Sequence, residues 1–295
     1  MDFLQPTSWQ EALDLRAERP DALPIAGGTD VMVDINFDRS RPGALMDLTR
    51  VAELREWSLD DGTGGGSVVR LGAGVPYARV VDDLGTHLPG LAMASRTVGS
   101  PQIRVRGTVG GNLGSASPAG DAHPPLLAAD AVVEVASAAR GARRLPVADF
   151  YTGVKRNALE PDELIAAVLI PSAAGPQQFC KIGTRNAMVI AVSAFAVALH
   201  PDRRAVGTGI GSAAPTPRRA LEAETFLAGE LESAGLWDSR GELPETLARA
   251  FGERVAGAAS PIDDVRGSAA YRLHSLSVMA RRAVTWAWND LRKAA

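Results

Sequence analysis

Two glycine-rich segments carry the residue types that could hold a phosphate-bearing ligand. The first, residues 26–30, reads Ala-Gly-Gly-Thr-Asp and lies between an apolar run and a stretch with helical periodicity. Glycine permits positive φ angles and a close approach of the backbone to a ligand, and successive amide N–H groups can surround an anion. We interpret this segment as a cradle for a pyrophosphate. A plain strand-to-helix turn is the alternative, since a lone pair of glycines is common there.

The second segment spans residues 106–121 and contains five glycines. It offers backbone amides, the hydroxyls of Thr108 and Ser117, the amide of Asn112 and the carboxylate of Asp121, a set that suits phosphates and a sugar or ring edge. With so many glycines and few apolar residues, we expect a functional loop that cannot belong to the core. A flexible surface linker is the alternative, and the apolar residues on both flanks disfavour it.

Several familiar catalytic and metal-binding patterns are missing from the sequence. It has no Gly-x-Gly-x-x-Gly dinucleotide fingerprint, no P-loop and no Gly-x-Ser-x-Gly nucleophile elbow. The single cysteine, Cys180, excludes a disulfide within the chain and any iron–sulfur cluster or structural zinc held by cysteines alone. The four histidines are scattered, so we expect no metal site and no catalytic residue of these classes.

Composition and charge limit the class of protein. The chain has 295 residues, 46% of them hydrophobic and 22% charged, with a formal net charge of -3. These values are typical of a soluble globular protein with more than one domain and give no indication of a nucleic-acid or anionic-membrane partner. No apolar run is long enough to span a bilayer. Residues 1–6 lack the basic start of a secretory signal, so we expect a cytoplasmic location.

Patterns of apolar residues predict the elements that must position the two glycine segments. Around the first segment, the sequence predicts a helix over 8–15, a strand over 22–25, a helix over 31–35 and a strand over 44–48. Around the second, it predicts strands over 68–74, 131–136, 143–147 and 164–170, a helix over 80–91 and an exposed hairpin tip over 60–67. We therefore expect an α/β subdomain over residues 1–56 and an α+β subdomain over residues 57–175.

The remaining residues, 176–295, are predicted to form a C-terminal α/β domain behind a linker at 172–176. Its expected elements are strands over 189–199 and 206–211 and helices over 217–228, 244–258 and 269–292.

The two glycine segments, in this order and about 80 residues apart, resemble those of the FAD-binding medium subunit of the molybdenum hydroxylases, the family of xanthine dehydrogenase and carbon monoxide dehydrogenase. Residues 42–54, 100–104 and 263–272 are similar to further signatures of that family. The resemblance covers nearly the whole chain. It implies a two-subdomain FAD-binding domain of the vanillyl-alcohol-oxidase (PCMH) type, followed by the C-terminal domain of the CO dehydrogenase flavoprotein type.

Carried over by position, the resemblance implies a set of cofactor-binding residues. Residues 25–31 and 108–112 would surround the pyrophosphate, Asp121 would bind the ribitol or adenosine end, and Lys181 would lie near the flavin ring. An ammonium there would stabilise a reduced, negatively charged flavin; a lysine extended to solvent from a sheet edge is the alternative. The implied residues are Ile25, Ala26, Gly27, Gly28, Thr29, Asp30, Val31, Val98, Thr108, Val109, Gly110, Gly111, Asn112, Ser117, Asp121, Leu164, Ile165 and Lys181.

The function implied is electron transfer inside a heteromeric molybdenum hydroxylase. A large partner would hold the molybdenum cofactor and a small partner two 2Fe-2S clusters, in a dimer of heterotrimers. This chain would bind FAD and pass electrons to NAD, with a quinone, a carrier protein or oxygen as alternative acceptors. Xanthine is the first expectation for the substrate of the complex. Two alternatives remain: a single-chain FAD oxidoreductase of the same cofactor fold that acts on its own substrate, and a scaffold subunit without cofactor.

Overall fold

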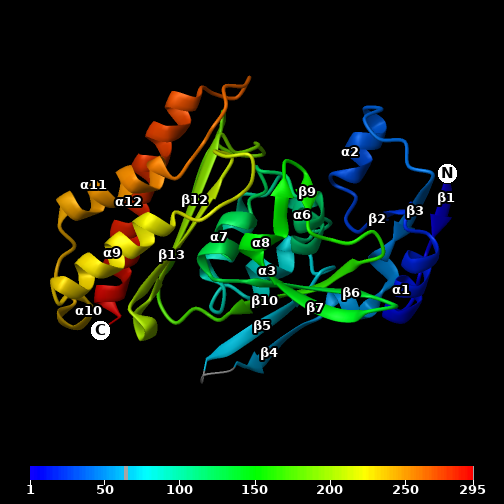
Figure 1. The fold of residues 1–295 in the computed structure, drawn as a ribbon, viewed down its shortest axis with the longest axis horizontal. Coiled ribbons are helices and arrows are strands. Elements are labelled where there is room, and N and C mark those ends of the chain that lie inside the picture. The colour runs from blue at the N-terminus through cyan, green and yellow to red at the C-terminus, as the bar shows by residue number, and fades with distance from the viewer. Residues whose placement is uncertain (63–65, 295) are drawn as a thin grey trace.

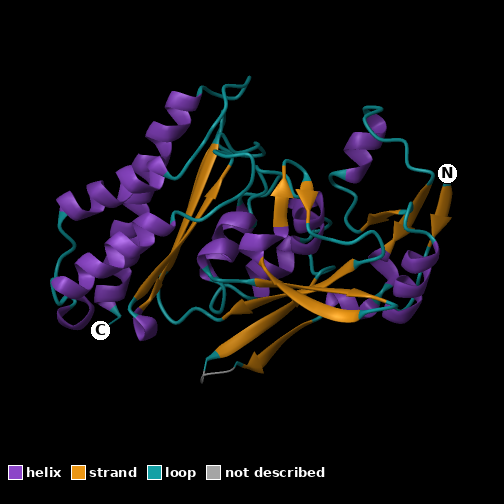
Figure 2. Ribbon diagram, viewed as in Figure 1, coloured by secondary structure: helices purple, strands orange, loops and turns teal. Residues whose placement is uncertain are grey.

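A computed structural model describes residues 1–62 and 66–294, and three sheets follow one another along its longest axis (Figure 1). The N-terminal sheet, the middle sheet and the C-terminal sheet have three, five and three strands. Helices lie between and beside them (Figure 2). The two ends of the chain therefore lie at opposite ends of the molecule (Figure 1).

The N-terminal sheet is parallel, with strand order β1-β3-β2. Ser8 caps the first helix by accepting the N–H of Glu11, as expected for a serine at this position. The first glycine segment connects β2 to α2, which agrees with the predicted strand-to-helix connection. The elements are β1 (Asp2–Leu4), α1 (Trp9–Glu18), β2 (Leu23–Ile25), α2 (Val31–Asn36), β3 (Ala44–Asp47) and the 3-10 turns η1 (Leu48–Arg50) and η2 (Ala52–Arg55).

The middle sheet is antiparallel, with strand order β4-β5-β10-β6-β7. Its central strand β10 is almost entirely buried, which explains its unbroken apolar sequence. Residues 63–65 of the predicted hairpin tip lie outside the described residues. The strands are β4 (Trp57–Asp61), β5 (Ser67–Gly72), β6 (Val132–Ser137), β7 (Gly141–Pro146) and β10 (Leu164–Pro171), and a separate hairpin consists of β8 (Tyr151–Gly153) and β9 (Arg156–Asn157).

Six helices accompany the middle sheet in the described part of the chain: α3 (Tyr77–Asp83), α4 (Pro89–Arg96), α5 (Pro101–Arg104), α6 (Val109–Ser115), α7 (His123–Ala128) and α8 (Val147–Phe150). The single helix predicted over 80–91 is wrong, because α3 ends at Asp83 and a new helix begins at Pro89. Proline lacks an N–H donor and disfavours helical backbone at the preceding residue. Leu88 accordingly leaves the helical region, with φ -131° and ψ 59°.

The second glycine segment is not the loop outside the core that the sequence predicts. Its central residues form α6, in which Val109, Gly110 and Leu113 are buried. The hydroxyl of Thr108 caps this helix by accepting the N–H of Gly111 at 2.9 Å. Gly110 packs so closely on Ala73 that a Cβ atom would lie 2.5 Å from the Ala73 Cβ. Close packing thus outweighs the poor intrinsic helix propensity of glycine.

The C-terminal sheet is antiparallel, with strand order β11-β12-β13, and four helices lie on one side of it (Figures 1 and 2). The predicted strand over 189–199 begins only at Ser193, and the predicted helix over 217–228 begins at Leu221. The elements are β11 (Gln177–Ile182), β12 (Ser193–His200), η3 (Pro201–Arg203), β13 (Ala205–Gly211), α9 (Leu221–Ser233), α10 (Leu236–Ser239), α11 (Glu245–Gly257) and α12 (Ala269–Lys293).

The other face of the C-terminal sheet is covered by α7 of the middle part, and glycines of β13 allow this contact. A Cβ atom at Gly207 would lie 2.0 Å from the carbonyl oxygen of Ala128, and one at Gly209 would lie 2.0 Å from that of Pro124. The alternate residues Val206 and Ile210 belong to the core beneath the C-terminal helices. The sheet is therefore packed on both faces, and the C-terminal part is held directly against the middle part.

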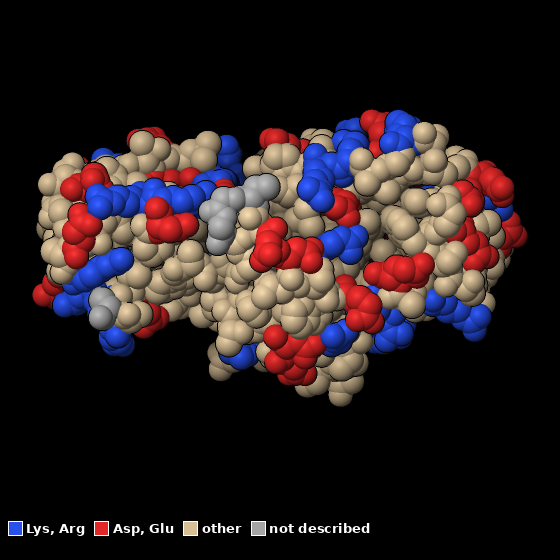
Figure 3. Space-filling model, turned by 90° about the horizontal axis from the view of Figure 1, so that it is seen from below, with Lys and Arg blue, Asp and Glu red and all other residues tan. Residues whose placement is uncertain are grey.

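Acidic and basic side chains are interspersed over the face shown in Figure 3. This mixture agrees with the small net charge of the chain. Within residues 1–62 and 66–294, none of the helices combines the length and the apolar character that crossing a membrane requires.

Candidate functional site

The two glycine segments meet in the folded chain, although about 80 residues separate them in the sequence. A Cβ atom at Gly27 would lie 2.0 Å from the carbonyl oxygen of Arg106, so the two backbones touch. A Cβ atom at Gly107 would lie 3.4 Å from the Thr29 hydroxyl oxygen. Gly28 adopts φ +75°, which favours glycine. The fold therefore brings together residues 25–31 and 108–112, the two halves of the predicted cradle.

Backbone donors gather at this meeting point. In the part of the chain that the structure describes, the N–H groups of Gly27, Gly28, Thr29, Val109 and Gly110 donate to no protein acceptor. Buried backbone N–H groups nearly always find a partner, and the first N–H groups of a helix, such as those of Val109 and Gly110, must find theirs outside it. Several unpaired N–H groups that converge form a concavity for an anion, so the donor set fits the diphosphate of FAD.

Buried polar side chains beside the second segment also lack hydrogen-bond partners among the residues that the structure describes. The unpaired atoms are Tyr77 Oη, Asn112 Oδ1, Asp121 Oδ1 and His123 Nε2. Leaving such an atom unsatisfied costs about 1–3 kcal/mol, so a ligand or ordered water is expected to complete these hydrogen bonds. The set includes a hydroxyl donor and carboxylate and amide acceptors, and it suits a ligand with phosphate and hydroxyl groups such as FAD.

Lys181 on β11 and Asp121 at the end of the second segment form an ion pair across the two parts of the chain. The Lys181 Nζ lies 2.6 Å from Asp121 Oδ2, and the two side chains are only 7% and 9% exposed. Thr97 joins them: its hydroxyl donates to Asp121 at 3.3 Å and its carbonyl accepts from Lys181 at 3.2 Å. Burial raises the pKa of Asp121, while the Lys181 ammonium acts in the opposite direction. The ammonium is thus held inside the molecule and does not extend into solvent.

A buried histidine packs against the end of the second segment. His123 Nδ1 is hydrogen-bonded to the Tyr151 hydroxyl at 2.7 Å, and burial lowers the pKa of His123 to about 3. The imidazole is therefore neutral at physiological pH. A Cβ atom at Gly120 would lie 2.3 Å from His123 Nε2 and 2.6 Å from Asn112 Oδ1. The backbone just before Asp121 is consequently pressed against both side chains.

The other predicted residues lie around the same region. Ile165 on β10 faces α6, since a Cβ atom at Gly114 would lie 3.9 Å from its side chain; Leu164 precedes it and is buried. Val98 follows Thr97 directly and packs against the core. The hydroxyl of Ser117 accepts the N–H of Ala119 at 3.4 Å. Lys181 contacts the end of the second segment rather than the first.

Three residues that the structure places here were not predicted from the sequence: Tyr77, Thr97 and His123. Thr97 directly precedes Val98, which was among the predicted cofactor-binding residues, so a prediction of residues 97–98 would have included it. Tyr77 and His123 lie outside the glycine patterns, and no spacing in the sequence indicated them. Across the described ranges, no group of three or more histidine, cysteine, aspartate or glutamate residues is arranged to hold a metal ion.

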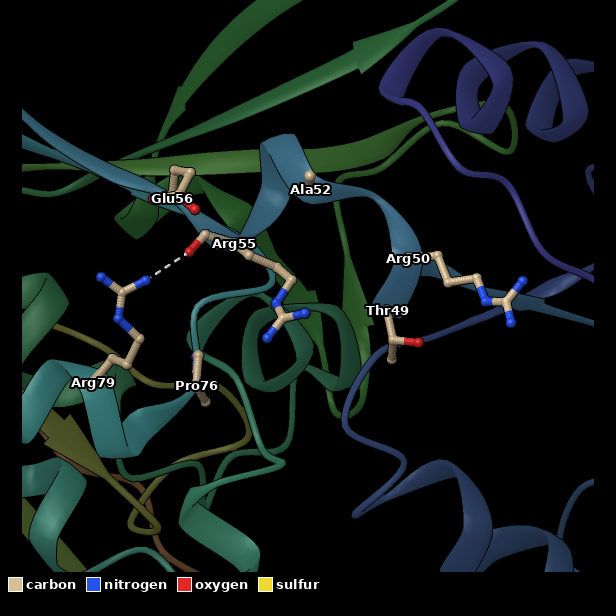
Figure 4. A pocket seen from close by; sticks show the side chains of 7 residues that line it. All are labelled: Thr49, Arg50, Ala52, Arg55, Glu56, Pro76 and Arg79. Atoms are coloured by element: carbon tan, nitrogen blue, oxygen red, sulfur yellow. Dashed lines mark hydrogen bonds between the residues drawn. The ribbon is translucent and has the colours of Figure 1, made fainter.

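An arginine-rich hollow of about 380 Å³ lies near the cradle without containing any predicted cofactor residue (Figure 4). Arg79 donates to the carbonyl oxygen of Arg55 at 3.0 Å. Pro76 borders both regions, because it also pairs with Thr108. The lining residues are Thr49, Arg50, Ala52, Arg55, Glu56, Pro76 and Arg79.

Comparison with known proteins accounts for nearly the whole chain. Residues 1–173 match the family described as the FAD binding domain in molybdopterin dehydrogenase, and residues 178–287 match the CO dehydrogenase flavoprotein C-terminal domain. A xanthine dehydrogenase FAD-binding subunit of Escherichia coli O157:H7 is 31% identical over 285 residues, which cover 93% of this chain and 91% of that protein.

Solved structures show the same fold. A chain of quinoline 2-oxidoreductase from Pseudomonas putida 86 matches with a TM-score of 0.87 and 26% identity, over 99% of this chain and 98% of that chain. A chain of reconstituted CO dehydrogenase from Oligotropha carboxidovorans matches with a TM-score of 0.86 and 28% identity, over 98% of each chain. The fold class expected from the sequence is confirmed.

Proposed function

We propose that this chain, which belongs to the family of FAD-binding medium subunits of molybdenum hydroxylase-type dehydrogenases, holds FAD between its two glycine segments as the electron-transfer subunit of a heteromeric enzyme. The observation that carries the proposal is the contact between Gly27 and Arg106, together with five backbone N–H groups of the two segments that donate to no acceptor within residues 1–62 and 66–294. When bound, FAD would supply the redox chemistry between iron–sulfur clusters of a partner and an acceptor, for which we propose NAD.

This chain would bind, orient and shield the cofactor. Residues 25–31 and 108–112 would hold the diphosphate through backbone N–H groups. Asp121 and Ser117 would bind hydroxyl groups of the ribitol or adenosine portion. Val98, Leu164 and Ile165 would provide apolar surface along the cofactor. The side chains of these last five residues, Ser117, Asp121, Val98, Leu164 and Ile165, are at least partly buried, which suits a site that excludes bulk water.

Lys181 would tune the site electrostatically. Its ammonium is almost fully buried and is fixed by Asp121 and Thr97. A fixed positive charge in a partly desolvated site stabilises nearby negative charge more strongly than it would in water. We therefore propose that Lys181 favours the reduced, negatively charged form of the flavin.

The rest of the enzyme would come from other chains. We propose a large partner with the molybdenum cofactor, a small partner with two 2Fe-2S clusters, and a cytoplasmic dimer of heterotrimers. The substrate would be selected by the large partner. The similar proteins carry names as different as xanthine dehydrogenase, quinoline 2-oxidoreductase and CO dehydrogenase. Xanthine is the first substrate to test.

Within this chain we propose three units, with domain boundaries near residues 56 and 175. The three separate sheets support these boundaries.

The first experiment measures cofactor binding and reduction in the full chain. We expect the purified protein to bind FAD at about one equivalent, and NADH to bleach the flavin absorbance under anaerobic conditions. Absence of FAD binding would overturn the assignment as a flavin subunit. FAD binding without reduction by NADH would overturn only the assignment of NAD as acceptor.

A second experiment tests the partners. The chain would be expressed with an affinity tag in its native host, and the captured complex analysed for molybdenum and iron. We expect both metals in a complex of three different chains that oxidises xanthine. Capture of the chain alone, with FAD bound and no metal, would favour a single-chain flavin enzyme instead.

A further inference from the structure

Tyr77 is a buried tyrosine whose hydroxyl group has no partner among the described residues. It is the first residue of α3, and only 3% of it is exposed. Its hydroxyl oxygen is inaccessible to solvent and forms no hydrogen bond. The two other tyrosines differ: the Tyr151 hydroxyl is bonded to His123, and Tyr271 is 49% exposed. The unpaired hydroxyl of Tyr77 therefore calls for a ligand or a water molecule.

The backbone places Tyr77 where the two glycine segments meet. Its N–H donates to the carbonyl oxygen of Gly107 at 3.0 Å, and the preceding Pro76 pairs with Thr108. A Cβ atom at Gly107 would lie 3.5 Å from the Tyr77 ring and 3.4 Å from the Thr29 hydroxyl. The start of α3 is thus attached to the second segment, and the ring lies close to the first.

The surroundings keep this phenol protonated. Burial, together with the nearby carboxylates of Asp121 and Asp30, raises the pKa of Tyr77 well above its usual range. Neither carboxylate accepts a hydrogen bond from it. The hydroxyl is therefore a neutral donor, and in the two adjoining segments the N–H groups of Thr29 and Gly110 also donate to no acceptor among the described residues. A ligand that satisfies all of these donors must be rich in acceptor atoms.

We propose that Tyr77 is a further binding residue of this site, and that its hydroxyl donates a hydrogen bond to a diphosphate oxygen of FAD. The inference rests on the proposed function, because it takes FAD as the ligand. A neutral phenol adds a donor without the repulsion that a carboxylate would exert on a diphosphate. Its rigid ring, packed against Gly107, loses little freedom when the ligand binds.

The test replaces the hydroxyl alone. The dissociation constants of FAD and of ADP would be measured for the full chain and for Tyr77→Phe, from the change in flavin fluorescence and from its reversal by ADP. We expect both ligands to bind about tenfold more weakly, the effect of losing one hydrogen bond to a charged group. Tyr271→Phe is the matched control, since its exposed ring lies on α12, and it should bind both ligands as the unmodified chain does.

Each outcome decides the question. Equal affinities in the unmodified chain and Tyr77→Phe would overturn the inference while the proposed function stands. A loss with FAD but not with ADP would overturn the assignment to the diphosphate. A lower thermal midpoint of the ligand-free Tyr77→Phe protein, with unchanged affinities, would assign the hydroxyl to a structural water. If the unmodified chain binds no FAD, the proposed function fails first and this inference fails with it.

Discussion

Lys181 and Asp121 form a buried ion pair on the side of the candidate site that faces the C-terminal sheet. Removing charged groups from water is costly, and a buried pair is retained only with good geometry and further hydrogen bonds. Thr97 supplies such bonds to both Lys181 and Asp121. If one partner is removed, the other is left as an uncompensated buried charge. The pair is therefore sensitive to substitution on either side.

Lys181→Met should lower the reduction potential of bound FAD, on the order of tens of millivolts, because the fixed ammonium no longer stabilises negative charge on the flavin. The measurement is a redox titration of the flavin in the full chain. Lys293→Met is the control, since that lysine is 77% exposed at the end of α12. A potential equal to that of the unmodified chain, at equal FAD content, would contradict the role given to Lys181.

At this scale the sequence indicated single residues but not their partners. Lys181 and Asp121 were each implied by the family resemblance, for different parts of the cofactor. Their ion pair could not be predicted, because it depends on how β11 is placed against the middle part of the chain. Tyr77 and Thr97 were missed for the same reason: a tyrosine or threonine acquires a role here only through the neighbours that folding gives it.

At the scale of elements, the cradle depends on backbones that touch. The first segment can approach Arg106 only because Gly27 has no side chain, and α6 can approach Ala73, the residue after β5, only because Gly110 has none. Glycine in these places permits contact distances that no other residue allows. Its cost in helix propensity is outweighed by the packing of Val109 and Leu113, which are fully buried.

Gly27→Ala should reduce FAD affinity at least tenfold and destabilise the ligand-free chain by about 1–3 kcal/mol, the usual effect of overpacking. The new Cβ would lie 2.0 Å from the Arg106 oxygen, so the two segments must separate. Affinity would be measured by FAD titration and stability by urea unfolding. Gly229→Ala on α9 is the control: its Cβ meets nothing within 4 Å, so it should bind FAD normally. Normal FAD affinity of Gly27→Ala would show that the segments need not touch.

Helices could be predicted from the sequence where a single pattern of apolar residues was clear. The helices over residues 245–257 and 269–293 lie close to their predicted ranges because an apolar stripe marks both of them, and Ser268 also caps the second. The prediction was wrong at α6, where five nearby glycines favoured a loop and tertiary packing formed a helix. The predicted helix over 80–91 joined α3 and α4 across Pro89, because the apolar periodicity continues through the break.

At the scale of the whole molecule, the candidate site lies where the N-terminal, middle and C-terminal parts converge. The first segment belongs to the N-terminal part, the second to the middle and Lys181 to the C-terminal sheet. From the sequence and the family resemblance we expected three consecutive units that each contain strands, but not whether each sheet is parallel or antiparallel. The mutual placement of the sheets could not be predicted, because it depends on shape-matched surfaces such as α7 against β13.

Acid should destabilise the chain through His123 on α7. Its pKa lies near 3 in the folded state and near 6.5 when unfolded, so unfolding between these values takes up a proton and stability falls as the pH decreases. The expected contribution is about 2–3 kcal/mol between about pH 7 and about pH 4.5. Urea unfolding of the ligand-free chain and of His123→Gln, which cannot titrate, would measure the difference. Identical pH dependence in the two proteins would contradict the buried neutral histidine.

The close packing of Gly207 and Gly209 on α7 has a consequence for a saturation mutagenesis screen of this chain. If variants were ranked by cellular abundance, these two positions would tolerate substitution as poorly as Gly27 and Gly110 do, although they lie in the C-terminal sheet and outside the cradle. Low abundance of the variants alone would therefore not distinguish the two classes of glycine. Only a second screen, which scores flavin occupancy among variants of equal abundance, would separate the glycines that hold the cofactor from those that hold the sheet.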